Sequence, residues 1–276
     1  MKKGILIALP GDEHCGSTTG LMPPGEWKFE TGGSYYPSPA QQWLYEQWET
    51  AWHKIRKLRK GRKLIVVNMG DAIDGAHHKT LELVTQNTDE QALIHIECMD
   101  RAMKIAGKFD SLYYIRGTES HVTTKEEFIA DDLGAVQKRP GSHVWDQLFL
   151  EGNSTLIDLC HHGAGVGRRA WTKGNSFRSM MVSYYYYLLD AGHRIPRYVV
   201  RAHQHQHTHR TIKDRKYNMD GLITPSFQLK THYGHRVANM ALSDIGMSYI
   251  IIDKDRSWAE TWLADVPERK PEVINV

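Results

Sequence analysis

The sequence predicts an α/β protein with two sheets, helices on the outside and loops that collect at one edge. Short apolar runs alternate with longer segments whose apolar residues recur at helical spacing. The first two apolar runs are residues 4–9 and 63–69, and the second half of the chain is mostly strand-like with one further helix. We expect residues 1–276 to form a single domain, because this length fits one large domain and no repeat or low-complexity segment divides it.

The composition is that of an ordinary globular enzyme, with 41% hydrophobic and 24% charged residues. A net charge of +3 is too small to indicate nucleic-acid binding by electrostatics alone. The three cysteines lie far apart and predict no disulfide framework, which favours a reducing compartment. No apolar run approaches the roughly 20 residues of a membrane helix, and residues 4–9 fit a first strand better than a signal peptide. We therefore expect a cytoplasmic protein without membrane contact; the sequence does not indicate an oligomeric state.

Capping signals and apolar runs place the individual elements. The predicted helices begin at Ser38-Pro39, at Thr88 with Gln91 as a capping box, at Thr124 with Glu127, and near Ser176, and three of them end near Gly61, Phe109 and Gly192. The predicted strands cover residues 4–9, 63–69, 111–115, 144–150, 154–160, 197–202, 247–253 and 258–263. We expect 144–150 and 154–160 to form a hairpin, and residues 16–60 to be a loop-plus-helix insertion.

Four of the predicted strands end in side chains that can bind a metal ion. These are Asp12-x-His14, Gly70-Asp71-x-x-Asp74, His161-His162 and His203-x-His205. Parallel strands bring their C-terminal loops to one edge of a sheet, so we expect these side chains to gather there. Aspartate and neutral histidine suit Zn, Mn or Fe, and a carboxylate can bridge two ions about 3.5–4 Å apart.

Histidine is unusually frequent, with 16 in the chain and four at alternate positions from 203 to 209. In one strand, four such side chains would lie on the same face, an arrangement that is costly without metal or water. Two choices of ligand stay open at this point. His203 and His205 could be replaced by His207 and His209, and His162 could replace His161.

In this order the motifs resemble those of the calcineurin-like metallophosphoesterase superfamily: D-x-H, G-D-x-x-D, G-N-H-[DE], a histidine before glycine, and G-H-x-H. The resemblance covers residue 4 to about 210, and residues 11–16 and 20–24 show a weaker similarity to phage-encoded members. It implies a four-layer α/β/β/α sandwich with two mixed sheets and a metal site at the C-terminal ends of the strands. It also implies two divalent ions (Mn²⁺, Zn²⁺, Fe or Mg²⁺), held by Asp12, His14 and His205 at the first, by His161 and His203 at the second, and by Asp71 between them.

The chain departs from this pattern at two places. Gly117-Thr118-Glu119-Ser120-His121 stands where the family has Gly-Asn-His, so the asparagine is absent and the histidine comes two positions late. We expect Glu119 to replace the asparagine as an oxygen ligand and His121 to act as general acid; otherwise the second metal site is weak. The second departure is Ala202, which stands where glycine is usual.

The resemblance implies hydrolysis of phosphate esters, with phosphodiesters favoured and nucleic acid or a nucleotide as candidate substrates. Two ions lower the pKa of bound water from about 15.7 towards about 7, and the resulting hydroxide attacks phosphorus. We expect Arg168 and Arg169 to bind a phosphate oxygen. The ligand histidines would be oriented by Asp74, Asp158 or Glu13.

Other interpretations of the sequence remain. The altered third motif allows a non-catalytic, metal-binding structural or interaction module. The His-x-His-x-His run superficially resembles metallo-β-lactamases, but Gln206-His207 stands where that pattern needs Asp-His. Basic residues between 54 and 63 could follow a phosphate backbone, but they also close a predicted helix and suit its dipole.

Overall fold

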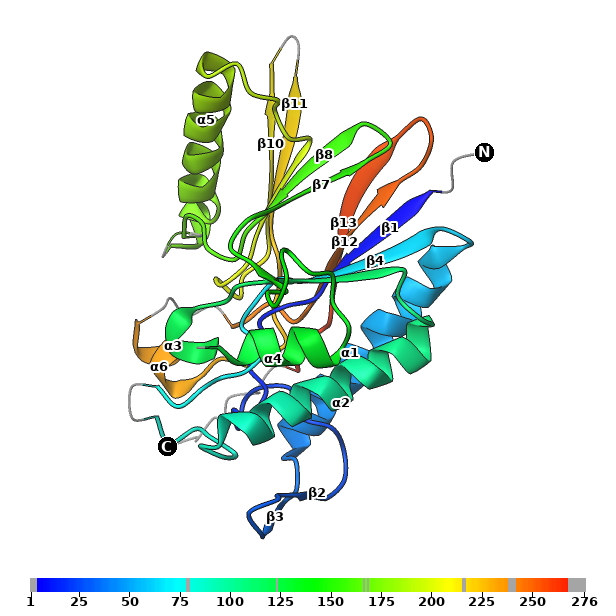
Figure 1. The fold of residues 1–276 in the computed structure, drawn as a ribbon. Helices are drawn as coiled ribbons and strands as arrows, with labels where there is room; N and C mark the ends of the chain where they lie inside the picture. Colours follow the sequence, from blue (N-terminus) through cyan, green and yellow to red (C-terminus); the bar gives the residue numbers. More distant parts are fainter. Residues whose placement is uncertain are drawn as a thin grey trace, which may run out of the picture.

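Two mixed sheets lie face to face between outer helices in the computed structural model, which describes residues 4–77, 80–122, 124–165, 167, 169–214, 217–237 and 242–267 (Figure 1). The first sheet has the order β13 (Ser257–Leu263), β12 (Gly246–Ile252), β1 (Ile5–Leu9), β4 (Lys63–Asn68), β5 (Ser111–Ile115), β6 (Val144–Trp145). The second has the order β10 (Thr208–Lys213), β11 (Asn218–Ile223), β9 (Tyr198–Arg201), β8 (Thr155–Leu159), β7 (Leu148–Gly152).

The helices complete the four layers. The first sheet is covered by α1 (Pro39–Arg59), α2 (Thr88–Ala106) and α4 (Lys125–Asp132), and the second by α5 (Asn175–Asp190). The short elements are β2 (Trp27–Lys28), β3 (Ser34–Tyr35), α3 (Glu119–Val122), a 3₁₀ turn (Ala170–Thr172) and α6 (His232–Val237). The predicted α/β/β/α sandwich is thus confirmed. In the described part of the chain, no helix is long and apolar enough to cross a membrane.

The alternation of side chains along the strands creates the layers. In β1, Leu6 and Ala8 pack under the helices, while Ile7 and Leu9 pack against the second sheet. Every one of these side chains is at most 2% exposed, so both faces of the strand are buried. This explains why the strand has a continuous apolar sequence rather than a polar–apolar alternation.

Helix α1 follows its sequence signals closely. Ser38 caps it in a capping box with Gln41, and Lys60 ends it in a left-handed conformation. Its basic end lies next to the start of β4, whereas the predicted ligands follow the end of that strand. Arg59 there pairs with Asp110 at 2.8 Å. The basic run 54–63 therefore lies at the edge opposite the ligands.

Two predicted helix caps were wrong. Asn87, not Thr88, caps α2, because its side chain accepts from the Asp89 N–H at 2.9 Å. Gln91 completes no capping box, since its Oε1 accepts from the Gly75 N–H at 2.7 Å. Thr124 makes no capping hydrogen bond to α4. Its expected partner Glu127 instead accepts from the backbone N–H of His143.

The strand predicted over 144–150 is split between the sheets. Residues 144–145 pair with β5 in the first sheet, and 148–152 form the β7–β8 hairpin in the second. The β10–β11 hairpin was not predicted. After buried Thr208, its outer strand alternates exposed and partly buried positions, and all of the exposed ones are polar.

Buried His95 on α2 predicts a loss of stability in acid. Its side chain is 0% exposed, with Nε2 2.9 Å from the Tyr114 hydroxyl, and burial lowers its pKa to about 3. The unfolded chain therefore takes up a proton below about pH 6.5 that the folded chain does not, so stability present at neutral pH is lost as pH falls. At pH 5 this loss is about 2 kcal/mol.

Urea unfolding at pH 7.5 and pH 5 measures this effect in the wild type and in His95→Gln. The variant should lose about 2 kcal/mol less free energy of unfolding on acidification than the wild type does. His53→Gln, at an exposed position on α1, is the control and should behave as the wild type. An equal pH dependence in His95→Gln would contradict the prediction.

Candidate metal centre

The C-terminal ends of β1, β4, β5, β8 and β9 lead into loops whose polar side chains converge. Within the described residues, four groups have ligand atoms within 4.8 Å of one another. They are Asp12–His14–His205, Asp12–Asp71–His161, His161–His162–His203 and His14–Asp74–His121. The structure therefore brings together six predicted ligands from four segments distant in sequence: Asp12, His14, Asp71, His161, His203 and His205.

The first group has the donor atoms of a cation site. His14 Nε2 and His205 Nε2 face each other at 3.3 Å, and His205 Nε2 lies 3.3 Å from Asp12 Oδ1. That Asp12 oxygen is fully buried and accepts no well-directed hydrogen bond within the described residues. His14 donates from Nδ1 to Asp74 Oδ1 at 2.9 Å, which leaves its Nε2 lone pair directed into the group.

The Asp71 carboxylate lies between the two halves of the centre. Its Oδ2 is 3.1 Å from His161 Nε2 and 3.8 Å from both His14 Nε2 and His203 Nδ1. Its Oδ1 accepts from the backbone N–H of Thr118 at 2.6 Å. One carboxylate oxygen thus contacts ligands of both groups, as a bridging carboxylate does.

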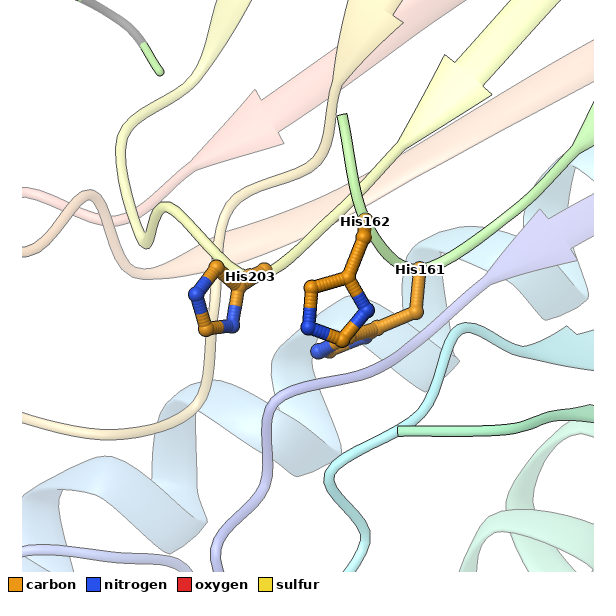
Figure 2. A group of neighbouring side chains, drawn as sticks. All are labelled: His161, His162 and His203. Carbon is orange, nitrogen blue, oxygen red and sulfur yellow. The ribbon is translucent and has the colours of Figure 1, made fainter. Parts of the chain in front are cut away.

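The second group consists of His161, His162 and His203, whose rings lie close together (Figure 2). His161 is 0% exposed and donates from Nδ1 to the Met69 carbonyl at 2.7 Å, so its Nε2 is the nitrogen that faces the centre, 3.1 Å from Asp71 Oδ2. His162 is exposed and lies beside His161 without replacing it. Both histidines of the open pair therefore lie in this group.

The electrostatics of the pocket favour positive charge at its centre. Burial would raise the pKa of Asp71, but the charge of His161 and hydrogen bonds from His161 and His203 lower it well below its usual value. Burial would likewise raise the pKa of Asp12, and His205 lowers it. Burial would lower the pKa of His161, but the Asp71 charge raises it to about 10. A divalent ion can supply the positive charge in place of these protons.

The ligand backbone is not extended. Five predicted ligands have a positive φ: Asp12 (51°), His14 (45°), Asp71 (54°), His203 (70°) and His205 (50°). Left-handed φ is uncommon outside glycine and is often found at functional sites. The conformation turns alternate side chains towards one point in a tight loop.

The four alternating histidines do not share a strand, because β9 ends at Arg201 and β10 begins at Thr208. His207 donates from Nδ1 to the Ile223 carbonyl at 2.9 Å, and His209 is exposed on β10. Neither belongs to a ligand group within the described residues. The geometry therefore favours His203 and His205.

His121 lies beside the first group. Its Nδ1 donates to the Asp74 carbonyl at 2.7 Å, and its ring meets the His14 ring edge-on at 4.8 Å between centroids. Burial, followed by the charge of His14, lowers its pKa to about 4. The imidazole is therefore mostly neutral at neutral pH.

The remaining predicted residues are spread around the centre. Glu119 is exposed at the start of α3 and is in none of the ligand groups found in the described chain. Arg169 is exposed, with its guanidinium 5.6 Å from the ring centre of Trp171, and Arg168 lies outside the described residues. Asp158 pairs with Arg201 at 2.9 Å and contacts no ligand histidine.

Glu13 connects two of the loops that carry the predicted ligands. Both of its carboxylate oxygens accept from Asn68 Nδ2, at 2.9 and 3.1 Å, and burial raises its pKa to about 8. Asn68 Oδ1 in turn accepts from the Gly70 backbone N–H at 3.0 Å. The pair therefore ties the loop after β1 to the loop after β4.

Two functional residues were missed by sequence reasoning. Thr118 takes the place where the motif has asparagine, and its Oγ1 lies 3.1 Å from Asp71 Oδ2 and 3.3 Å from His161 Nε2. Glu126 is fully buried and accepts from the backbone N–H of Gly117 at 2.9 Å, next to Thr118. A buried glutamate on an otherwise ordinary short helix gives no sequence signal, whereas Thr118 could have been found by direct alignment with Gly-Asn-His.

Glycine at 70 and 117 allows the loops after β4 and β5 to touch. A Cβ on Gly117 would lie 2.3 Å from the backbone N of Asp71, and one on Gly70 would lie 2.7 Å from His161 Nδ1. Both distances are shorter than any stable contact, so larger residues there would displace the ligands.

Glu126→Leu should destabilise the protein, because it leaves the buried Gly117 N–H without an acceptor. A loss of about 1–3 kcal/mol in the free energy of unfolding is expected. Urea unfolding measures it, with Asp132→Asn, exposed on the same helix, as the control. A loss no larger than that of the control would show that the Glu126–Gly117 contact is unimportant.

Comparison with known proteins finds only remote similarity. No protein-family model and no curated protein sequence matches this chain. Among solved structures, a dimetal phosphatase from Danio rerio has 9% identity and a TM-score of 0.45, with 93% of this chain and 95% of that chain covered. A predicted phosphoesterase from Streptococcus pneumoniae has 10% identity and a TM-score of 0.38, with 95% and 91% covered. A metallophosphoesterase from Sphaerobacter thermophilus has 8% identity and a TM-score of 0.34, with 95% and 89% covered. With TM-scores this low, none of these likenesses bears on function.

Proposed function

We propose that this chain is a phosphoesterase that depends on two divalent metal ions. The single observation that carries the proposal is Asp71 Oδ2, which lies within 3.8 Å of imidazole nitrogens from two separate ligand groups. Two groups that share one buried carboxylate are the arrangement expected for a pair of ions about 3.5–4 Å apart.

The residues fit such ions. The buried Asp12 Oδ1 lacks a well-directed donor in the described chain. The Nδ1 atoms of His14 and His161 are both held by hydrogen bonds, so that Nε2 of each faces the centre. Asp12, His14 and His205 would hold the first ion, His161 and His203 the second, with Asp71 between them. Bound ions of this kind supply Lewis acidity and an activated water near neutral pH.

The oxygen next to the second ion would come from the hydroxyl of Thr118 rather than from the carboxylate of Glu119. Its Oγ1 lies 3.2 Å from His203 Nδ1, whereas Glu119 is exposed. Thr118 also holds both oxygens of Asp71, one through its N–H and one through its hydroxyl. This double contact fixes the orientation of the shared carboxylate.

His121 is the candidate proton donor to the leaving oxygen. Its pKa must rise from about 4 for this role, and the negative charge of a bound phosphate ester acts in that direction. The Asp74 carbonyl already holds Nδ1–H, so the transferred proton would be at Nε2. Arg169, which is exposed, is proposed to bind a phosphate oxygen of the substrate.

Phosphodiesters, including nucleotides or nucleic acid, are the proposed substrate class. Lys173 and Arg201 are already neutralised by carboxylates, Asp244 at 3.0 Å and Asp158 at 2.9 Å. These two cations therefore offer little positive charge to a substrate. A diester carries one negative charge near neutral pH and a monoester up to two. The diester therefore requires less cationic compensation.

Hydrolysis of bis-p-nitrophenyl phosphate and p-nitrophenyl phosphate with Mn²⁺ tests the proposal. Asp71→Ala should lower diester hydrolysis by at least about a hundredfold, because it removes the group shared by both ions. His209→Ala, an exposed histidine outside the ligand groups, should retain wild-type activity. Two bound ions without turnover of either ester would instead support a non-catalytic metal-binding module.

Metal removal should destabilise the protein. An ion that binds only the folded chain adds about 2.7 kcal/mol at a concentration of 100 Kd, which for a chain of this size raises Tm by roughly 5 °C or more. Thermal unfolding of chelator-treated protein with and without Mn²⁺ measures the shift. Asp71→Ala should lose most of the Tm shift caused by Mn²⁺. An unchanged Tm shift in that variant would show that the ion binds at another site.

A further inference from the structure

Three imidazoles converge on one point of the second group. His161 Nε2, His162 Nε2 and His203 Nδ1 lie 3.3, 3.4 and 3.2 Å from Thr118 Oγ1. Each of the three residues also has a ring nitrogen within 4.8 Å of a ring nitrogen of the other two (Figure 2). The proposed function uses only two of these histidines, so the third needs its own explanation.

Packing does not explain His162. It is exposed, although its ring lies 4.7 Å from the ring of His161 and 4.8 Å from that of His203, measured between centroids. Protonated imidazoles at this separation repel one another, and neutral ones aimed at a common point are suited to binding a cation. An exposed side chain without a packing role would otherwise turn into solvent, where its entropy is higher.

A bend after β8 brings His161 and His162 to the same side, although they are consecutive residues. Neighbouring side chains in a strand point to opposite faces, but β8 ends at Leu159 and residue 161 lies in a bend. The His161 carbonyl accepts from Ala202 N–H at 2.9 Å, which holds this bend against the loop after β9. Gly163 follows at once, and a Cβ there would lie 2.8 Å from Arg201 Cγ.

We propose that His162 is a third imidazole ligand of the second ion, together with His161, His203 and Asp71. This inference rests on the proposed two-ion site and deepens it. Thr118 then serves mainly to hold the shared carboxylate, since its hydroxyl donates to Asp71 Oδ2 at 3.1 Å.

The proposal makes the two metal positions chemically different. The first has two imidazoles and the Asp12 carboxylate beside Asp71, whereas the second has three imidazoles beside the same carboxylate. Imidazole suits Zn²⁺, Co²⁺ and Fe²⁺, and oxygen-rich sites suit Mg²⁺ and Mn²⁺. The second position should therefore prefer Zn²⁺ or Co²⁺ over Mg²⁺.

Titration of chelator-treated protein with Co²⁺ tests this, followed by calorimetry, visible absorption and metal content. The wild type should bind two ions. His162→Ala should weaken the second by at least about tenfold and change its absorption, because one nitrogen ligand is lost. His209→Ala is the matched control and should bind both ions like the wild type. Because His162 is exposed, His162→Ala should keep the wild-type circular dichroism.

The outcomes separate the two proposals. Weakened Co²⁺ binding in His162→Ala supports the ligand assignment even if no ester is hydrolysed, a result that would count only against the phosphoesterase proposal. Wild-type affinity for both ions in His162→Ala overturns the assignment, and lost hydrolysis in that case would make His162 a residue that acts on substrate. Binding of a single ion by the wild type overturns it as well.

Discussion

The candidate centre depends on the placement of one buried carboxylate, that of Asp71. It is 1% exposed, and its two oxygens contact Thr118, His161 and, at longer range, His14 and His203. A carboxylate this deep in the protein is costly unless charge and hydrogen bonds compensate it. The histidines on the neighbouring loops provide that compensation. Loss of this group would leave the four ligand segments without the contact that joins them.

The surrounding structure fixes this arrangement through backbone contacts. Met69 and Asp74 use their carbonyls to hold the Nδ1 atoms of His161 and His121, and the Asp74 side chain holds that of His14. Glu126 holds the chain at Gly117. Glu126 lies on α4, and Met69 and Asp74 lie in a buried stretch of the chain that follows β4. Ligand orientation is therefore coupled to the packing of the first sheet, which favours a preorganised site.

The sequence predicts the two sheets, the outer helices and most of the residues that meet at the candidate centre, because these depend on local patterns: continuous apolar strands, followed by polar residues at fixed spacing. It could not predict which residues take a left-handed backbone, since Asp12 and His203 adopt it only under tertiary contacts. The pairing of Glu126 with Gly117 and the split of residues 144–150 between two sheets likewise depend on long-range packing. Thr118 is a different case, because a hydroxyl is a less common metal ligand than the carboxylate of Glu119. Only the structure shows its Oγ1 next to Asp71 and His161.

The backbone conformation and the buried carboxylate at the ligand loops make folding less favourable, and a bound cation would offset this cost. Five predicted ligands have a left-handed φ, and strain of this kind is of order 1 kcal/mol for each residue. Asp12 adds a buried carboxylate oxygen without a well-directed donor in the described chain. Together these costs amount to several kcal/mol, against a total stability of about 5–15 kcal/mol for a typical domain. Because two ions binding only the folded chain would offset a cost of that size, metal binding and folding should be coupled in this protein.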